Sequence, residues 1–255
     1  MLSKKNIIRL GAILIAAVVI TSSIQISFAE GLPNYSELQK ALKKIVKEKN
    51  GGFGFNMWAT IVDRDGVVKA LTFSGKERGD QWPGSRVISA QKANTANAFS
   101  LPGLALSTAN LFSAVQPGGS LYGLQFSNPV STEAAYKGPS ENIGTENDPM
   151  VGLKIGGVNV FGGGLPLYDS TGKLVGAIGV SGDSSCADHN IAWKLRHALQ
   201  LDYIPGGVST SKDDNIVLDI TNNISASGWG HPVCSADASA VANELPKTHP
   251  VKPRK

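Results

Sequence analysis

Four side chains suited to binding a flat, metal-bearing ligand lie on one predicted helix, Ser185–Leu201. An imidazole can ligate a metal, an indole can stack on a planar ring, and a guanidinium can pair with a carboxylate. A helical wheel separates an apolar stripe from these side chains. The stripe holds Ala187, Ile191, Leu195, Ala198 and Leu199, and the nearly opposite side holds His189, Trp193, Arg196 and His197. We expect an exposed binding face with His189 as the metal ligand. A plain exposed face with a capping-turn histidine is the alternative.

An exposed tryptophan favours burial against a partner, so we expect Trp193 to meet a second subunit or a ligand. A second predicted helix, which opens at Pro83 or Ser85 and runs to about Phe99, carries Lys92 and Thr95 near one face. Lys92 can pair with a ligand carboxylate. A surface lysine or a structural ion pair is the alternative interpretation of the same residue.

Motifs of the common catalytic classes are absent from the sequence. It contains no Gly-x-Ser-x-Gly, no phosphate-binding loop and no zinc-ligand spacing. Asp63 and Asp65 flank a turn, and Asp-x-Asp-Gly is a common hairpin composition. The sequence therefore commits to no catalytic residue.

The two cysteines, Cys186 and Cys234, predict one disulfide. It would close a loop of about 48 residues and contribute roughly 3–4 kcal/mol in the chain-entropy model. A metal-binding or redox-active pair is the alternative, although no Cys-x-x-Cys is present. His231 lies near Cys234 and either closes over a site or belongs to an ordinary Gly-His-Pro turn.

Residues 1–29 have the pattern of a secretory signal peptide. Lys4, Lys5 and Arg9 form a basic start, an apolar stretch follows, and Ser27-Phe28-Ala29 supplies small residues before a cleavage point. The apolar run is short for a membrane span of about 20 residues, although an uncleaved anchor remains an alternative. We expect a periplasmic or secreted protein without stable membrane insertion after cleavage.

The formal net charge of +4 arises from the two ends of the chain. Seven of the 24 basic residues lie in residues 1–29 and 247–255, where no acidic residue occurs, which leaves 17 against 20 acidic residues in between. A nucleic-acid-binding domain would carry a basic patch in its folded part, so this class is not expected. Residues 247–255 read as a disordered basic tail.

The order of elements predicts an α+β domain. Amphipathic periodicity marks a helix at 34–49, and alternating apolar residues mark strands at 55–63 and 67–74 around an Asp-Gly turn. Further strands are expected at 158–168 and 174–180, and a short edge strand at 215–220. Strands joined by tight turns are antiparallel, so we expect a five-stranded antiparallel sheet with flanking helices.

Two segments interrupt or follow this pattern. Residues from about 101 to 150 are punctuated by glycine and proline and read as an insertion that covers one sheet edge. The expected organisation is a domain over 30–204 that contains this insertion, and a C-terminal arm over 205–246 stapled by the disulfide.

Two groups of residues resemble the GlcG/HbpS family of haem-binding proteins. Trp58–Gly66 is similar to the family's first hairpin, and Ser89–Phe99 to the helix after it. Gly162–Leu167 followed by Gly172–Gly182 resembles the second half. The resemblance runs from about Ser36 to Leu201 and implies a profilin-like fold, self-association into homo-oligomers, and haem as the cofactor.

With haem as the ligand, His189 would ligate the iron, and Trp193, Arg196, His197, Lys92 and Thr95 would complete the site. We expect an exported haem carrier, store or sensor that binds haem at a subunit interface. The alternatives are an enzyme acting on haem or a small organic acid, and a non-catalytic oligomeric module that senses a ligand. The sequence does not distinguish a catalytic role from a non-catalytic one.

Overall fold

The computed structural model describes residues 31–252, so the predicted signal peptide lies outside the described residues. Four strands form one antiparallel sheet in the order β2-β1-β4-β3. Their bounds are β1 Trp58–Asp63, β2 Val68–Phe73, β3 Gly164–Tyr168 and β4 Leu174–Ser181. The two strands from the first half of the chain thus pair with the two from the second half through β1 and β4.

The predicted five-stranded sheet is wrong, because the sheet has four strands. Residues 215–218 join no sheet strand and instead run against helix α5 (Ser185–Ala198), where the Ile216 backbone N–H meets His189. Farther along, β5 (Ile220–Thr221) and β6 (Ile224–Ser225) form a separate two-stranded hairpin. The expected fifth strand is therefore used to cover a helix.

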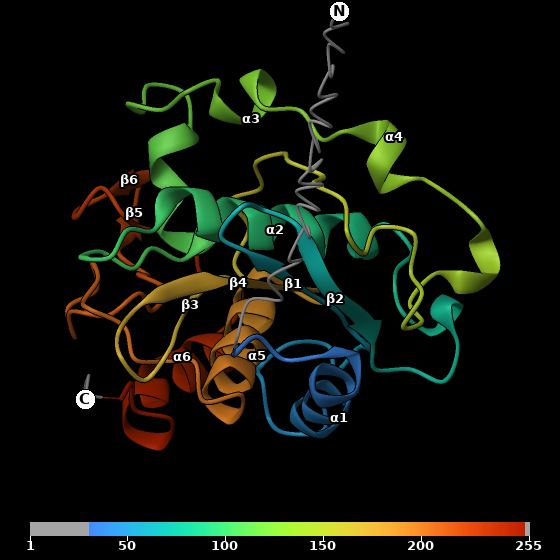
Figure 1. The fold of residues 1–255 in the computed structure, drawn as a ribbon. Helices are drawn as coiled ribbons and strands as arrows, with labels where there is room; N and C mark the ends of the chain where they lie inside the picture. The colour runs from blue at the N-terminus through green and yellow to red at the C-terminus, as the bar shows by residue number, and fades with distance from the viewer. Residues whose placement is uncertain (1–30, 253–255) are drawn as a thin grey trace, which may run out of the picture. The chain divides into compact units, whose positions relative to one another are not determined.

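Helices cover both faces of the sheet (Figure 1). Helix α2 (Ser85–Phe99) lies on one face, and α1 (Tyr35–Ile45) and α5 lie on the other. Helix α6 (Ala236–Thr248) packs on the outer side of α5. Alternation along β1 explains the two cores: Ala59 and Ile61 join the α1/α5 side, while the neighbouring Trp58 and Val62 join the α2 side.

Glycines in β4 let α2 approach the sheet closely. A Cβ on Gly179 would lie 1.9 Å from the Ser89 carbonyl oxygen, and one on Gly176 would lie 2.1 Å from the Val62 carbonyl oxygen. Side chains at these positions would force the helix or the neighbouring strand away. The strand-and-turn glycines thus serve packing.

The segment from Leu101 to Gly163 contains only short helices and turns. They are the 3-10 turns Thr108–Leu111 (η2), Ser113–Val115 (η3) and Ser140–Asn142 (η4), and the helices α3 (Leu124–Ser127) and α4 (Thr132–Ala135). A further 3-10 turn, η1 (Arg78–Asp80), precedes α2. Figure 1 shows α3 and α4 beyond α2, on the side away from the sheet, so this part of the insertion covers a helix.

The C-terminal residues differ from the predicted disorder. Helix α6 continues through Lys247 and Thr248, Val251 packs against two apolar clusters, and the Lys252 N–H donates to the Asp202 carbonyl. These contacts tie the predicted tail to the domain as far as the described residues extend. Among residues 31–252, no helix has the length and apolarity needed to cross a bilayer.

Candidate functional site

Helix α5 begins at Ser185, directly after its N-cap residue. Ser184 is the N-cap residue, and its hydroxyl accepts from the Ala187 N–H. Asp188 accepts from the Asp183 N–H at 2.9 Å. Two side chains therefore stabilise the turn between β4 and α5. The helix that follows this turn packs across the sheet.

The predicted exposed face of α5 is buried. Trp193 is 1% exposed, and His189 and Arg196 are 0% exposed. The C-terminal arm and α6 cover this face: the Trp193 indole N–H donates to the His249 carbonyl at 2.9 Å, and the Asn190 amide donates to the Ala238 carbonyl. The prediction of an open face was wrong because the helix has a second layer packed on it.

His189 is enclosed by the arm. Its Nε2 lies 3.1 Å from both the Asn215 Oδ1 and the Ile216 backbone nitrogen, and Nδ1 has no hydrogen-bond partner among the described residues. Burial lowers the pKa of this imidazole to about 3. His189 is therefore neutral at pH 7, and no face of its ring is open to a large ligand.

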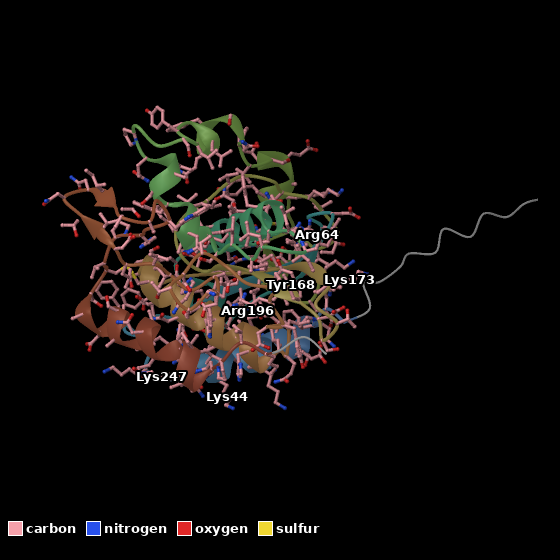
Figure 2. All side chains as sticks on the ribbon, turned by 90° about the vertical axis from the view of Figure 1, so that its left-hand side faces the viewer. Lys44, Arg64, Tyr168, Lys173, Arg196 and Lys247 are labelled. Atoms are coloured by element: carbon pink, nitrogen blue, oxygen red, sulfur yellow. A yellow bond between two sulfur atoms is a disulfide. The ribbon has the colours of Figure 1, made fainter. Side chains whose placement is uncertain are left out.

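Arg196 is bound to a carboxylate of the arm. Its two terminal nitrogens lie 2.6 and 2.7 Å from the Asp214 carboxylate oxygens, and Nη1 also donates to the Pro166 carbonyl. The guanidinium lies 4.9 Å from the centre of the Trp193 ring. Figure 2 shows Arg196 within the fold, whereas Lys44 and Lys247 lie at its margin. The expected partner of Arg196, a ligand carboxylate, is replaced by Asp214.

Lys92 forms a buried ion pair with Asp188. The Lys92 Nζ lies 2.6 Å from Asp188 Oδ2 and donates to the Val180 carbonyl at 3.0 Å. Both side chains are at most 3% exposed. Burial raises the pKa of Asp188 to about 6 and lowers that of Lys92. This geometry favours the structural ion pair for Lys92.

Thr95 connects α2 to the segment that precedes β3. Its hydroxyl donates to the Gln91 carbonyl and accepts from the Asn159 N–H at 3.0 Å. Both hydrogen-bonding functions of the hydroxyl are thus used within the protein.

The predicted disulfide between Cys186 and Cys234 is confirmed, with a Cα–Cα distance of 5.9 Å. It brings His231 against Ser185, whose Oγ lies 2.7 Å from His231 Nε2 and 2.6 Å from the Gly162 nitrogen. The sequence singled out His231 only through its nearness to Cys234. Nothing in the sequence pointed to Ser185 as its partner, because 46 residues separate the two.

His197 differs from the other three side chains of the predicted face. Its side chain is 27% exposed, and Nδ1 lies 2.7 Å from an Asp202 carboxylate oxygen. Nε2 has no hydrogen-bond partner within residues 31–252, and the His249 ring packs edge-on at 5.3 Å. A carboxylate on one ring nitrogen is the usual way to orient a histidine whose other nitrogen binds a metal.

Cavities of about 560 and 700 Å³ lie outside the buried part of α5. A groove of about 560 Å³ runs between α1 and the C-terminal end of α5. It is lined by Gly31, Leu32, Pro33, Glu37, Lys40, Ala41, Lys44, Ala198 and Leu199. Apolar side chains and two lysines together suit a ligand with a flat apolar body and negative groups.

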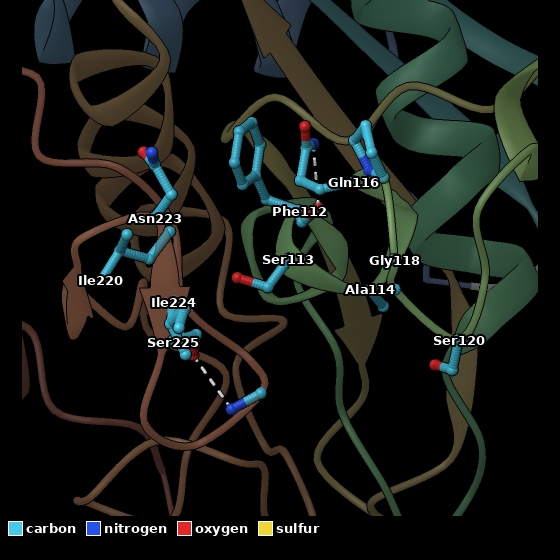
Figure 3. A pocket seen from close by; sticks show the side chains of 13 residues that line it. Phe112, Ser113, Ala114, Gln116, Gly118, Ser120, Ile220, Asn223, Ile224 and Ser225 are labelled. Carbon is cyan, nitrogen blue, oxygen red and sulfur yellow. Dashed lines mark hydrogen bonds between the residues drawn. The ribbon is translucent and has the colours of Figure 1, made fainter.

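The larger cavity, about 700 Å³, lies between the insertion and the β5–β6 hairpin (Figure 3). Phe112, Gln116, Ser120, Asn223 and Ile224 are among its lining residues, and no lining residue is charged. The side chains in this cavity therefore offer neither an imidazole nor a cation to an anionic metal-bearing ligand.

The fold and these sites describe an α+β domain with helices on both faces of its sheet and a cationic, part-apolar groove. The chain belongs to the HbpS-like haem-degrading protein family, whose model matches residues 34–196. No curated protein sequence matches it. The family match ends at Arg196, so the whole arm and α6 lie beyond it.

Three solved structures align with part of this chain. The Klebsiella pneumoniae protein ORFY is 25% identical, with 64% of this chain and 86% of that chain covered and a TM-score of 0.44. The PduOC:haem complex is 26% identical, with 64% and 89% covered and a TM-score of 0.43. A double mutant of Streptomyces reticuli HbpS is 16% identical, with 74% and 96% covered and a TM-score of 0.39.

Proposed function

We propose that this protein is an exported haem-binding protein that acts as a carrier, store or sensor. The observation that carries the proposal is the match of residues 34–196 to the HbpS-like haem-degrading family. The Cys186–Cys234 disulfide supports export, because disulfides persist in oxidising compartments. Localisation in the periplasm or outside the cell follows from this argument and from the signal-like sequence of residues 1–29.

The groove between α1 and α5 suits haem better than the predicted α5 face does. Leu32, Ala41 and Leu199 provide apolar surface, and the exposed Lys40 and Lys44 provide two cations at its border. Haem has an apolar macrocycle and two propionates, so the lysines would pair with the propionates while the apolar side chains contact the ring. When bound, haem would supply a redox-active iron.

His197 is the member of the predicted set that we propose as an iron ligand. Its ring is partly exposed and Asp202 orients it through Nδ1. The ring packs against His249 and does not itself line the groove, which begins at the next residue, Ala198. His189 is a poorer ligand, because a haem cannot reach it without displacing the arm. The other predicted site residues would not touch haem. They would support the site indirectly by stabilising the packing of α2, α5 and the arm, and they are Lys92, Thr95, Trp193 and Arg196.

A second copy of the chain would complete the site. The groove is open to solvent, and haem buried between two subunits would be covered on both faces. An exposed aromatic cluster near Asp183, at the other end of α5 from the groove, independently supports self-association: the Phe55 ring stacks on the Phe53 ring and meets the Trp82 ring edge-on, both at 5.4 Å. Phe53 is 73% exposed and Trp82 is 54% exposed. A group of three aromatic side chains this exposed to solvent is unusual and marks a surface that binds a partner.

Reconstitution of the purified mature protein with hemin tests the proposal. We expect a defined Soret band that changes position or intensity in His197→Ala and is retained in His189→Ala. Sedimentation of apo and loaded protein reports the oligomer. Absence of a defined Soret band would overturn haem binding, and a band unaffected by His197→Ala would overturn the ligand assignment. Loss of the Soret band with time under reductant and oxygen would indicate an enzyme acting on haem.

A further inference from the structure

Cys186, His231 and Cys234 gather three metal-ligating side chains at the N-terminal end of α5. The two Sγ atoms and a ring nitrogen of His231 all lie within 4.8 Å of one another. In the oxidised protein the two sulfurs are joined and carry no charge, so they cannot bind a metal. Reduction would turn the same three side chains into a set of two thiols and one imidazole.

The two sulfurs differ in access. Cys186 is fully buried in the first turn of α5, whereas Cys234 is exposed. An incoming thiolate therefore meets the Cys234 sulfur first, and the Cys186 sulfur leaves as a thiolate at a helix N-terminus, where the helix dipole favours negative charge. The Cys186 N–H also points at the Cys234 Sγ, 3.1 Å away, and would stabilise the second thiolate.

Contacts other than the disulfide keep the three side chains together. The His231 backbone N–H donates to the Val217 carbonyl at 2.7 Å, and its Nδ1–H donates to the Pro232 carbonyl at 2.7 Å. The lone pair of the neutral ring is therefore on Nε2, which would exchange its 2.7 Å contact with Ser185 Oγ for the metal. The Phe112 ring lies 5.0 Å from the His231 ring. On the other side of Cys234, the Ser235 hydroxyl donates to the Gly51 carbonyl and caps α6. Cys234 is thus anchored on both sides by bonds that reduction does not break.

We propose that the reduced protein binds one zinc ion through Cys186, Cys234 and His231, so that the disulfide controls a metal site. Two thiolates and an imidazole are a donor set typical of zinc, and three protein ligands leave the fourth tetrahedral position for water. Oxygen-preferring ions such as Mg²⁺ and Ca²⁺ would not compete for these ligands.

The reaction balances with a dithiol as the reductant. The dithiol transfers two electrons and two protons to the disulfide, becomes a disulfide itself, and leaves two protein thiols. Zinc then replaces the two thiol protons, which are released to solvent, and the imidazole adds as a neutral ligand. Reoxidation requires the loss of zinc, because each sulfur must give up its bond to the metal before the disulfide can form.

This site is separate from the proposed haem groove, which lies at the opposite end of α5 near Ala198 and Leu199. Whether the reduced protein binds zinc is therefore independent of whether the protein binds haem.

Cobalt substitution tests the proposal. The full mature chain is reduced with a phosphine under anaerobic conditions, freed of reductant and titrated with Co²⁺. We expect one Co²⁺ per chain with the charge-transfer bands of thiolate–cobalt and the visible bands of tetrahedral Co²⁺, both removed by Zn²⁺. His231→Asn should weaken Co²⁺ binding at least tenfold, whereas the matched variant His249→Asn should not. Thiolate bands that are absent, or that are unchanged in His231→Asn, would overturn the site.

A second measurement needs no substitution. In a redox titration of the wild-type disulfide, zinc should raise the midpoint potential by about 30 mV for each tenfold excess of free zinc over its dissociation constant. A midpoint independent of zinc, or a reduced wild-type chain that has lost its cooperative unfolding transition, would contradict a preformed site.

Discussion

The two ends of helix α5 place polar side chains in opposite settings. At the N-terminal end, Asp188 is paired with Lys92, both buried, and the buried Cys186 is bonded to Cys234 of the arm. At the C-terminal end, His197 is partly exposed and Ala198 opens onto a groove bordered by lysines. The N-terminal end of α5 is therefore structural and covered by the arm. The C-terminal end is open and leaves space for a large ligand.

This comparison shows that residue type alone does not identify a ligand-binding side chain. His189 and His197 are both imidazoles on one helix, but one is enclosed by Asn215 and Ile216 and the other has a free ring nitrogen within the described residues. The arm that covers the first lies beyond the family match, so the covering is a feature of this chain's own C-terminal segment.

The largest effect should follow from Lys92→Met, which leaves Asp188 buried without its partner. Removing one member of a buried ion pair costs about 3–5 kcal/mol of unfolding free energy. Chemical denaturation measures the loss. The matched control is Lys247→Met, because the Lys247–Glu244 pair is exposed and should change stability by less than about 1 kcal/mol. Equal effects of the two variants would remove the distinction between the two settings.

Removal of the disulfide by Cys186→Ser with Cys234→Ser should rank next. The bridge spans 48 residues, and the chain-entropy model gives roughly 4 kcal/mol for a loop of that length. Thermal and denaturant unfolding of the oxidised wild type and the double variant would measure it. A loss below about 1 kcal/mol would mean that the arm stays docked through its hydrogen bonds alone.

Acid should destabilise the protein through its buried histidines. The pKa values of His189 and His231 fall from 6.5 to about 3 and about 4 on folding, so the unfolded state binds more protons once the pH drops below about 6.5. The stability present above that pH is lost as the pH falls toward 4. The raised pKa of Asp188 acts in the opposite direction between 3.8 and about 6, and it offsets part of the loss.

His231→Gln isolates one histidine in this pH dependence. It should reduce the slope of unfolding free energy between pH 6 and 4 by up to about 1.4 kcal/mol per pH unit, the value for one proton. Denaturant unfolding at a series of pH values would measure both slopes. His249→Gln is the comparison: burial also lowers the pKa of this half-buried imidazole, so it should reduce the slope less than His231→Gln does. Identical slopes for wild type and His231→Gln would show that His231 is already accessible to protons.

The smallest effect is expected for the lysines that border the groove at the C-terminal end of α5. Lys40→Gln with Lys44→Gln should weaken hemin binding about three- to tenfold, because exposed ion pairs contribute at most about 1 kcal/mol each. The loss should shrink as salt rises. Hemin titration at two salt concentrations measures it, with Lys247→Gln as the exposed control. A larger loss in Lys247→Gln than in the double variant would place the ligand elsewhere.

Much of the fold was accessible from the sequence. The alternating apolar residues of β1 and β2 and the Asp-Gly turn between them predicted a hairpin that the structure contains. The fifth strand failed because a run such as Asn215–Ile220 carries strand propensity whether it pairs with a sheet or packs along a helix. Whether such a run joins a sheet depends on which sheet edge is free to pair with it. At the edge strand β3, the described residues form one isolated bridge, between Tyr168 and Asp202, and no further strand.

By itself, the sequence indicated the family through its motifs. It also determined the hairpin, helices α1, α2 and α5 and the cysteine pair, because local periodicity and a pair of cysteines leave few alternatives. Only the tertiary structure decided which polar side chains of α5 remain available. A helical wheel assumes that the side away from the apolar stripe faces water. Here α6 and the arm lie over that side, and burial of Arg196 is possible because Asp214, 18 residues away, meets its charge.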